Sequence, residues 1–445
     1  MKLTGLLIAI LVLAGLLGVV YWSNHHKFSE EASPKSSPSA AAKILSLNQA
    51  DITHVTIRRK AQAQTNLSRG SSGAWQITAP EVLTADQEEV SKVLSTLSSL
   101  NADRLLEEKA ADLAPYGLAN PELEVDVTLK DNKTQKLLIG DETPSGNAFY
   151  AVLAGEPRLF TLGRYLKSSL DKTGSDLRDK RLLSADFDNV SQIELLNRVP
   201  EKKCDLTIVR SKDGWQILSP KPYRADARQV EALIRLLREA RMELSPGVEN
   251  PSIASAFDSA RPFVTTKIMG ASGSQQLEIR KNKDGYYAKS SAVPGIFKVS
   301  STLGSALDKD LDDFRDKKLF DFGYSDPTKI EIRKGAQSYF FTRSDSDWWG
   351  PDGKKLDRTG SATLVNALRE LSAEKFPDSG FSSPVLEITV TSDDGKRVEH
   401  VSFAKNGEAF VAKREKEPAL YQFSFSSVQQ VEEAASNIKA AGSPH

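Results

Sequence analysis

The sequence contains three imperfect copies of one pattern, and such a repeat constrains the fold of a chain more than any local motif does. Each copy holds a tryptophan that a proline follows within a few residues, in residues 75–80, 215–220 and 348–351. The first two copies keep one spacing throughout, whereas the third is shorter. Since the chain has 445 residues, each copy is long enough to bury its own core.

Each tryptophan is followed by an aspartate that opens a helical pattern, at Asp86, Asp226 and Asp357. Aspartate is a favoured N-cap because its carboxylate accepts hydrogen bonds from the free N–H groups of the first turn. Glu89 and Gln229 stand three residues after the first two aspartates, which is the capping-box spacing. The three aspartates therefore indicate three helix starts.

The residues after each aspartate carry one apolar helical face, at the same offsets in every copy. Its members are Val93, Leu94, Leu97, Leu233, Ile234, Leu237, Leu364, Val365 and Leu368. This repetition predicts helices over residues 86–100, 226–243 and 359–373.

Strand patterns flank each helix. Apolar and polar residues alternate ahead of each tryptophan, and a proline opens a further strand pattern behind each helix, at Pro121, Pro262 and Pro384. Alternation is typical of antiparallel sheets with one buried and one wet face. We therefore expect an α+β protein, with an N-terminal transmembrane helix followed by three tandem α+β repeats with mainly antiparallel sheets.

The repeats are placed at residues 46–183, 184–320 and 321–436. The first two end on similar polar segments, whereas the third ends in a helical pattern and a tail at residues 437–445.

An apolar run at residues 6–22 contains no charged residue and ends in Tyr21 and Trp22. With its flanks it just crosses a hydrocarbon core of about 30 Å. A cleaved secretory signal is the competing interpretation, but the run lacks a small-residue cleavage site at its end. We expect a cytoplasmic leader at residues 1–5, a single-pass anchor in the inner (cytoplasmic) membrane, a flexible linker at residues 23–45, and the bulk of the chain on the periplasmic side.

Two similar basic linkers close the first two repeats, and both follow an Arg-Asp-Lys pattern. One hypothesis makes them basic patches for an anionic lipid, a glycan or a protein partner. The other makes them interdomain joints, in which Arg and Asp satisfy helix ends and pair across repeats. Their equivalent placement favours the joint. The residues are Arg178, Lys180, Arg181, Arg315, Lys317 and Lys318.

Two further residues are candidates for a role. Trp349 is a second aromatic beside Trp348, and it suits either a binding surface or packing within the last repeat. Cys204, the single cysteine, follows two lysines that favour a lowered thiol pKa, although a thiol without a role is the simpler interpretation.

Charge and composition disfavour several classes of function. The 59 basic and 59 acidic residues balance, whereas a nucleic-acid binder normally carries a basic excess. The five histidines are scattered and one cysteine makes no thiolate cluster, so we expect no metal site and no cofactor. No histidine, cysteine or carboxylate pattern indicates catalysis, so we expect a protein that is not an enzyme.

A short Tyr-Ala strand pattern also recurs, at Tyr150-Ala151 and Tyr287-Ala288. Together with this pattern, the Trp-x-Ile segment with its helix, the proline-led strand, the Arg-Asp-Lys linker and the apolar N-terminus resemble the bacterial domain of unknown function DUF4340. The resemblance covers most of residues 46–436. It implies a membrane-anchored, extracytoplasmic protein associated with ABC-type export or gliding-associated transporter components, and it implies no catalytic residue.

The leading hypothesis is therefore a scaffold or accessory component that binds another membrane or envelope protein. Two alternatives remain open. One is a hydrolase or transferase that acts on envelope glycans through carboxylates, and the other is a repeat array that binds a lipid or small ligand.

Overall fold

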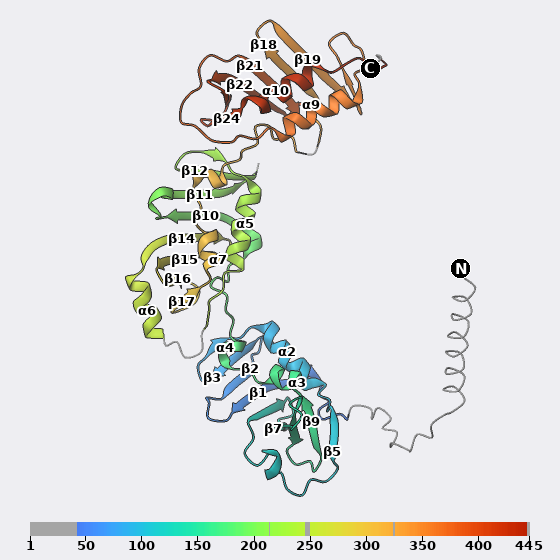
Figure 1. Cartoon of the computed structure of the whole chain (residues 1–445), viewed down its shortest axis with the longest axis vertical. Coiled ribbons are helices and arrows are strands. Elements are labelled where there is room, and N and C mark those ends of the chain that lie inside the picture. The colour runs from blue at the N-terminus through green and yellow to red at the C-terminus, as the bar shows by residue number, and fades with distance from the viewer. Residues whose placement is uncertain (1–41, 213, 245–249, 324, 443–445) are drawn as a thin grey trace, which may run out of the picture. The chain divides into compact units, whose positions relative to one another are not determined.

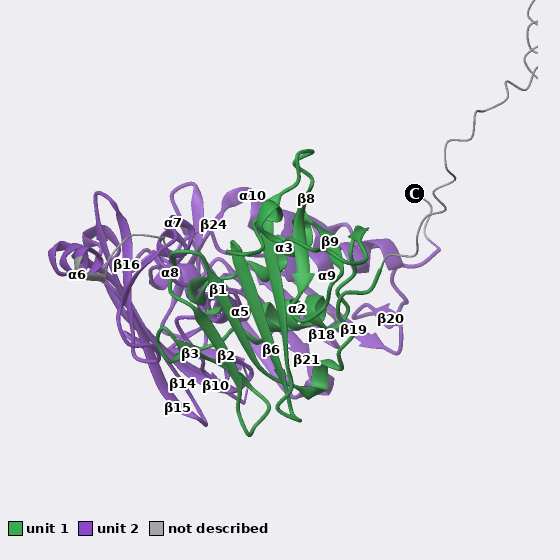
Figure 2. Cartoon of the chain, turned by 90° about the horizontal axis from the view of Figure 1, so that it is seen from below, with its two compact units in different colours: residues 1–179 green, residues 180–445 purple. Residues whose placement is uncertain are grey.

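The computed structural model describes residues 42–212, 214–244, 250–323 and 325–442. The chain divides into two compact units, residues 1–179 and 180–445, which Figure 2 shows in different colours. The predicted leader, the anchor at residues 6–22 and nearly all of the linker lie outside the described residues. Among the helices that the structure does describe, none has the length and apolar character needed to cross a membrane.

The described part of unit 1 forms one antiparallel sheet and three α-helices (Figure 1). The sheet order is β4-β3-β2-β1-β6-β7-β8-β9-β5. The strands are β1 (Ile52–Arg59), β2 (Thr65–Arg69), β3 (Trp75–Ala79), β4 (Leu83–Thr84), β5 (Arg104–Glu107), β6 (Leu123–Leu129), β7 (Thr134–Glu142), β8 (Ala148–Leu153) and β9 (Leu159–Gly163). The helices are α2 (Gln87–Ser98), α3 (Arg164–Leu170) and α4 (Gly174–Leu177).

The second sheet belongs to unit 2 and repeats this order as β13-β12-β11-β10-β14-β15-β16-β17. Its strands are β10 (Val190–Asn197), β11 (Cys204–Ser211), β12 (Gly214–Ser219), β13 (Tyr223–Arg224), β14 (Arg261–Gly270), β15 (Gly273–Asn282), β16 (Gly285–Ser290) and β17 (Ile296–Val299). Its helices are α5 (Ala227–Arg238), α6 (Asn250–Ser259), α7 (Ser301–Ala306) and α8 (Leu311–Phe314).

The third sheet also belongs to unit 2, in the order β20-β19-β18-β21-β22-β23-β24. Its strands are β18 (Lys329–Lys334), β19 (Gln337–Ser344), β20 (Asp347–Trp349), β21 (Leu386–Ser392), β22 (Arg397–Asn406), β23 (Ala409–Arg414) and β24 (Leu420–Ser424). Its helices are α9 (Arg358–Glu370) and α10 (Phe425–Ser436). We call each sheet with its helices a repeat, numbered 1 to 3 in chain order.

All the strand pairs of the described residues are antiparallel, so the expected sheet type is confirmed, and the chain is an α+β protein with three antiparallel sheets. In each repeat the chain passes from a short meander through the main helix to a strand beside the first one, as in the β1–β6 pair. The main helices α2, α5 and α9 cover one face of their sheets, and in repeat 3 α10 lies beside α9 (Figure 1).

The repeated tryptophans belong to the three cores. Trp75, Trp215 and Trp348 are only 6%, 6% and 7% exposed. Each of them stands opposite an arginine on the neighbouring strand: Arg69, Arg210 and Arg343. The strand residues that alternate with the core positions face away from the helices, as the polar positions of β6 do between buried Leu123, Val125 and Val127.

The main helices begin at the predicted aspartates but end earlier than predicted. Predicted helix 226–243 stops at Arg238, and predicted helix 359–373 stops at Glu370. The physical reason is that the following residues give up helical hydrogen bonds to pair with a segment from the preceding connection, as Leu182 N–H does with the Ala240 carbonyl oxygen at 2.9 Å.

All three aspartates cap their helices through the side chain. Asp86 accepts from the N–H groups of Glu88 and Glu89, at 3.0 and 3.3 Å, while Asp226 accepts from Arg228 N–H at 2.9 Å. The capping boxes are found instead in the two short helices: Thr173 with Asp176 in α4, and Asp310 with Asp313 in α8.

Replacement of Asp226 by alanine is expected to lower the free energy of unfolding of unit 2 by about 0.5–2 kcal/mol, because the first turn of α5 loses its cap. Calorimetry of the purified protein measures this loss. Arg228→Ala, at a side chain that is 80% exposed, is the control. Equal stability of the two variants would contradict the capping role.

Trp215→Ala is expected to cost about 3–5 kcal/mol, because removal of a buried indole leaves a cavity in the second core. The same calorimetric transition reports it. A variant as stable as the natural protein would mean that the indole does not pack in this core.

Candidate functional site

The two predicted basic linkers are the connecting segments between repeats, residues 177–183 and 314–320. The first half of each connecting segment forms main-chain hydrogen bonds with residues just before the main helix of the repeat that it leaves. In unit 1, Asp86 N–H donates to the Leu177 carbonyl oxygen at 2.8 Å, and Asp179 N–H donates to the Thr84 carbonyl oxygen at 2.9 Å. In unit 2, Asp226 N–H donates to Phe314 at 2.8 Å, in the same way.

The second half of each connecting segment forms main-chain hydrogen bonds with residues just after the main helix of the next repeat. Met242 N–H donates to the Lys180 carbonyl oxygen at 2.8 Å, and Ala373 N–H donates to that of Lys317, also at 2.8 Å. Both halves therefore fix helix ends, which are rich in unpaired main-chain groups.

Two segments that do not match the linker sequence occupy the same positions. At the start of repeat 1, Ala102 N–H donates to the Ala42 carbonyl oxygen and Ile44 N–H to that of Leu100, at 2.8 and 2.9 Å. At the end of repeat 3, Asp357 N–H donates to the Lys439 carbonyl oxygen at 2.9 Å. Sequence comparison missed both segments because main-chain pairing demands no particular side chain.

The predicted interaction residues divide by exposure. Arg181 and Lys317 are exposed, whereas Arg178, Lys180 and Lys318 are partly buried. Arg178 pairs with Ala85 in a β-bridge. Partial burial lowers the pKa of its guanidinium, and the negative charges of Glu81 and Asp179 offset only part of that effect.

Arg315 is only 8% exposed, so it does not belong to a surface patch. Its guanidinium carbon lies 4.2 Å from the ring centre of Tyr223 and 3.7 Å from that of Phe376. Its Nη1 is also 3.3 Å from Asp312 Oδ1. These contacts make Arg315 part of the joint within unit 2, since a stacked and paired guanidinium tolerates burial.

Further charged groups surround this joint. Arg224 pairs with Asp316, and its Nε lies 2.8 Å from Glu417 Oε1. Burial alone would lower the pKa of Arg224, but the electrostatic effects of Tyr421, Asp316 and Glu417 outweigh burial and raise it. Burial raises the pKa of Tyr421 to about 12, and Glu417 adds to this effect while Arg224 opposes it.

Trp349 lies on the face of the third sheet that looks away from the helices, because it alternates with the buried Trp348. It is partly exposed and pairs across strands with Thr342. Phe340, 36% exposed, alternates with the core residue Phe341 on the same strand as Thr342, and Lys329 Nζ lies 4.7 Å from its ring centre. This face therefore combines aromatic and polar side chains.

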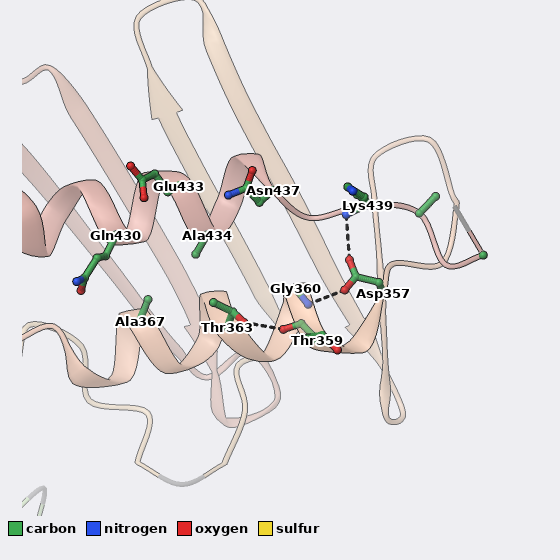
Figure 3. Close-up of a pocket in the computed structure, with 12 residues that line it drawn as sticks. Asp357, Thr359, Gly360, Thr363, Ala367, Gln430, Glu433, Ala434, Asn437 and Lys439 are labelled. Atoms are coloured by element: carbon green, nitrogen blue, oxygen red, sulfur yellow. Dashed lines mark hydrogen bonds between the residues drawn. The ribbon is translucent and has the colours of Figure 1, made fainter. Parts of the chain in front are cut away.

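A groove of about 620 Å³ runs between α9 and α10 (Figure 3). Gly360, Ala367 and Ala434 form part of its walls, and the Asp357 carboxylate lies at one end. That carboxylate accepts from Gly360 N–H at 2.6 Å and from Lys439 N–H at 3.0 Å. Asp357 thus caps the helix and fixes the C-terminal segment, which is a structural role.

The environment of Cys204 shifts its thiol pKa in the direction opposite to that expected from the neighbouring lysines. Burial raises its pKa, and its Sγ lies 3.8 Å from the Lys309 carbonyl oxygen. Among the residues that the structure describes, no group of three or more histidine, cysteine, aspartate or glutamate side chains is placed to hold a metal ion.

The raised pKa of Tyr421 predicts a loss of stability in alkali. The folded protein holds the phenol neutral up to a pKa of about 12, against an ordinary value of 10.0. This contribution is therefore present below pH 10 and is lost as the pH rises towards 12, with a total of about 3 kcal/mol. Chemical denaturation measures the free energy of unfolding at each pH. Tyr421→Phe should weaken its fall between pH 10 and 12, whereas Tyr165→Phe, at an 80% exposed ring, should not. Equal slopes in all three proteins would contradict the assignment.

The family comparison identifies the chain. No curated protein matches it. A crystal structure of a DNA polymerase sliding clamp from Pseudomonas aeruginosa aligns over 85% of this chain and 93% of that one, but at 9% identity and a TM-score of 0.15 it supports no argument. The model of the domain of unknown function DUF4340 matches twice, over residues 75–252 and 215–394. Each match begins at a repeat tryptophan and contains one connecting segment. The chain belongs to the DUF4340 family, with two overlapping copies of its domain.

Proposed function

We propose that this protein is a non-enzymatic, single-pass membrane protein that acts as a scaffold or accessory component of an envelope or ABC-type transporter assembly. The observation that carries the proposal is that each repeat covers one sheet face with its main helix and leaves polar side chains on the other. Such faces offer a protein partner an extended surface of matched charges and aromatic anchors.

The charges on these faces are arranged in pairs. On the first sheet Arg58 Nη1 lies 2.6 Å from Asp126 Oδ2, and Lys136 Nζ lies 3.5 Å from Glu124 Oε2. Lys136 Nζ also lies 3.6 Å from Asp126 Oδ1, so both carboxylate oxygens of Asp126 face a cation. A surface that already balances its own charges suits a protein partner better than a polyanion.

The residues proposed for partner contact are the exposed or partly exposed members of the predicted set: Arg178, Lys180, Arg181, Lys317, Lys318 and Trp349. Trp349 is the strongest candidate, because large aromatic side chains at the centre of an interface supply much of its binding energy. It lies on the sheet face away from the helices, and Phe340 is two residues before its cross-strand partner Thr342 on the neighbouring strand.

The anchor and its side of the membrane are proposed from the sequence. The apolar run at residues 6–22 would hold the chain in the inner membrane, with the repeats on the periplasmic side. A short tether would then keep the first repeat near the bilayer, where a membrane protein partner is within reach.

Cross-linking of the full chain in its native membrane, followed by mild detergent extraction and mass spectrometry, tests the proposal. We expect a transporter permease or another envelope protein in fixed proportion, and we expect Trp349→Ala to reduce its recovery. Tyr165→Ala, at an 80% exposed ring on α3, is the matched control and should leave recovery unchanged.

Other outcomes would contradict the proposal. Recovery of a monomer without partner under several detergents would remove the accessory role. Co-extracted lipid without protein would favour the lipid-binding alternative, and turnover of purified envelope glycan would favour the hydrolase or transferase alternative.

A further inference from the structure

Unit 2 contains a cluster of alternating charges where repeat 2 meets repeat 3. We name it the joint cluster. Arg224 comes from the last short strand of the repeat 2 meander, and Arg315 and Asp316 come from the connecting segment. Three members come from repeat 3: Glu399, Arg414 and Glu417.

Arg224 joins elements that are far apart in the sequence. Its Nη1 pairs with Asp316, its Nη2 donates to the Lys318 carbonyl oxygen, and its Nε lies 2.8 Å from Glu417 Oε1. The side chains of Arg224, Asp316 and Glu417 are 20%, 19% and 15% exposed, so water screens these pairs weakly.

Glu417 is itself held in place within repeat 3. It lies in the turn between β23 and β24, where Arg414 Nε is 2.8 Å from its Oε1 and the Tyr421 hydroxyl donates to its Oε2. Arg414 in turn pairs with Glu399 at 2.9 Å and donates to the Leu319 carbonyl oxygen. Contacts within repeat 3 thus hold the Glu417 carboxylate in the position from which it pairs with Arg224 of repeat 2.

Arg315 adds a second link between the same two repeats. Its guanidinium lies over Tyr223 of repeat 2 and over Phe376 of repeat 3. Movement of repeat 3 away from repeat 2 would break the contact of this cation with one of the two rings, so the stacking favours the joined arrangement.

Among the described residues, the position of repeat 1 that corresponds to Arg224 and the position of repeat 2 that corresponds to Glu417 carry different side chains. In repeat 1 the meander ends in Leu83 and Thr84, where repeat 2 has Tyr223 and Arg224. In repeat 2 the turn between β16 and β17, residues 291–295, contains no acidic residue, whereas the corresponding turn of repeat 3 contains Glu417. The charged pairing therefore belongs to one particular pair of repeats.

We propose that Arg224 and Glu417 form a clasp that holds repeats 2 and 3 as one rigid body. Removal of Glu417 leaves Arg224 paired only within its own side of the joint, with Asp316, and removal of Arg224 leaves Glu417 with Arg414 and Tyr421. Either change therefore removes the charge pair that crosses from repeat 2 to repeat 3, where water screens it weakly. Each repeat keeps its own core and main helix, so separation requires no unfolding.

Distance distributions between two spin labels test the clasp in the full chain. Cys204→Ser removes the natural thiol, and Lys283→Cys with Glu408→Cys places one label in an exposed turn of each repeat. We expect one narrow distance peak in this background and a broad distribution after Glu417→Gln or Arg224→Gln. Arg238→Gln, at an exposed pair with Asp188, is the control and should keep the narrow peak.

A folding defect must be distinguished from loss of the clasp. We expect Glu417→Gln to keep both cores intact, because Glu417 lies in the turn between β23 and β24. Circular dichroism of each variant should match that of the labelled background. A broad distribution in the background itself, or a narrow one in a folded Glu417→Gln variant, would overturn the proposal. These results do not depend on whether a partner is recovered from the membrane.

Discussion

Main-chain pairing at the ends of the three main helices is the interaction on which the rest of the structure depends. A helix end exposes N–H and carbonyl groups that lack partners within the helix. Here a connecting segment satisfies such groups before one helix and after the next: the Phe314 carbonyl oxygen accepts from Asp226 N–H, and Leu319 N–H donates to the Leu371 carbonyl oxygen. The same contacts therefore complete one repeat and start the following one.

This arrangement explains why the connecting segments vary in sequence. Leu177 and Phe314 are buried, whereas their counterpart near the C-terminus is the exposed Lys439, and its carbonyl oxygen still accepts from Asp357 at the start of the preceding main helix. The family model matches twice in ranges that each enclose a connecting segment. Each matched range thus includes a connecting segment together with parts of the sheets that precede and follow it in the sequence.

Side chains add specificity to this common backbone scheme. The basic residues of the connecting segments are not equivalent: Arg315 stacks on two rings in the interior, whereas Arg181 is exposed. Burial of a charge is tolerated only where partners surround it, and Arg224, Asp316 and Glu417 supply such partners beside Arg315. Equivalent arginines of two similar linkers therefore differ in environment: one is buried in a joint and the other is exposed to solvent.

The sequence by itself determined the α+β class, the antiparallel sheets and the helix starts at Asp86, Asp226 and Asp357, because periodicity and capping are local properties of the chain. Its repeated motifs also indicated the family. The tertiary structure alone decided where the helices end, which face Trp349 occupies, that burial raises the pKa of Cys204, and that Glu417 reaches Arg224. Those features depend on contacts between residues far apart in the sequence, and no local pattern encodes them.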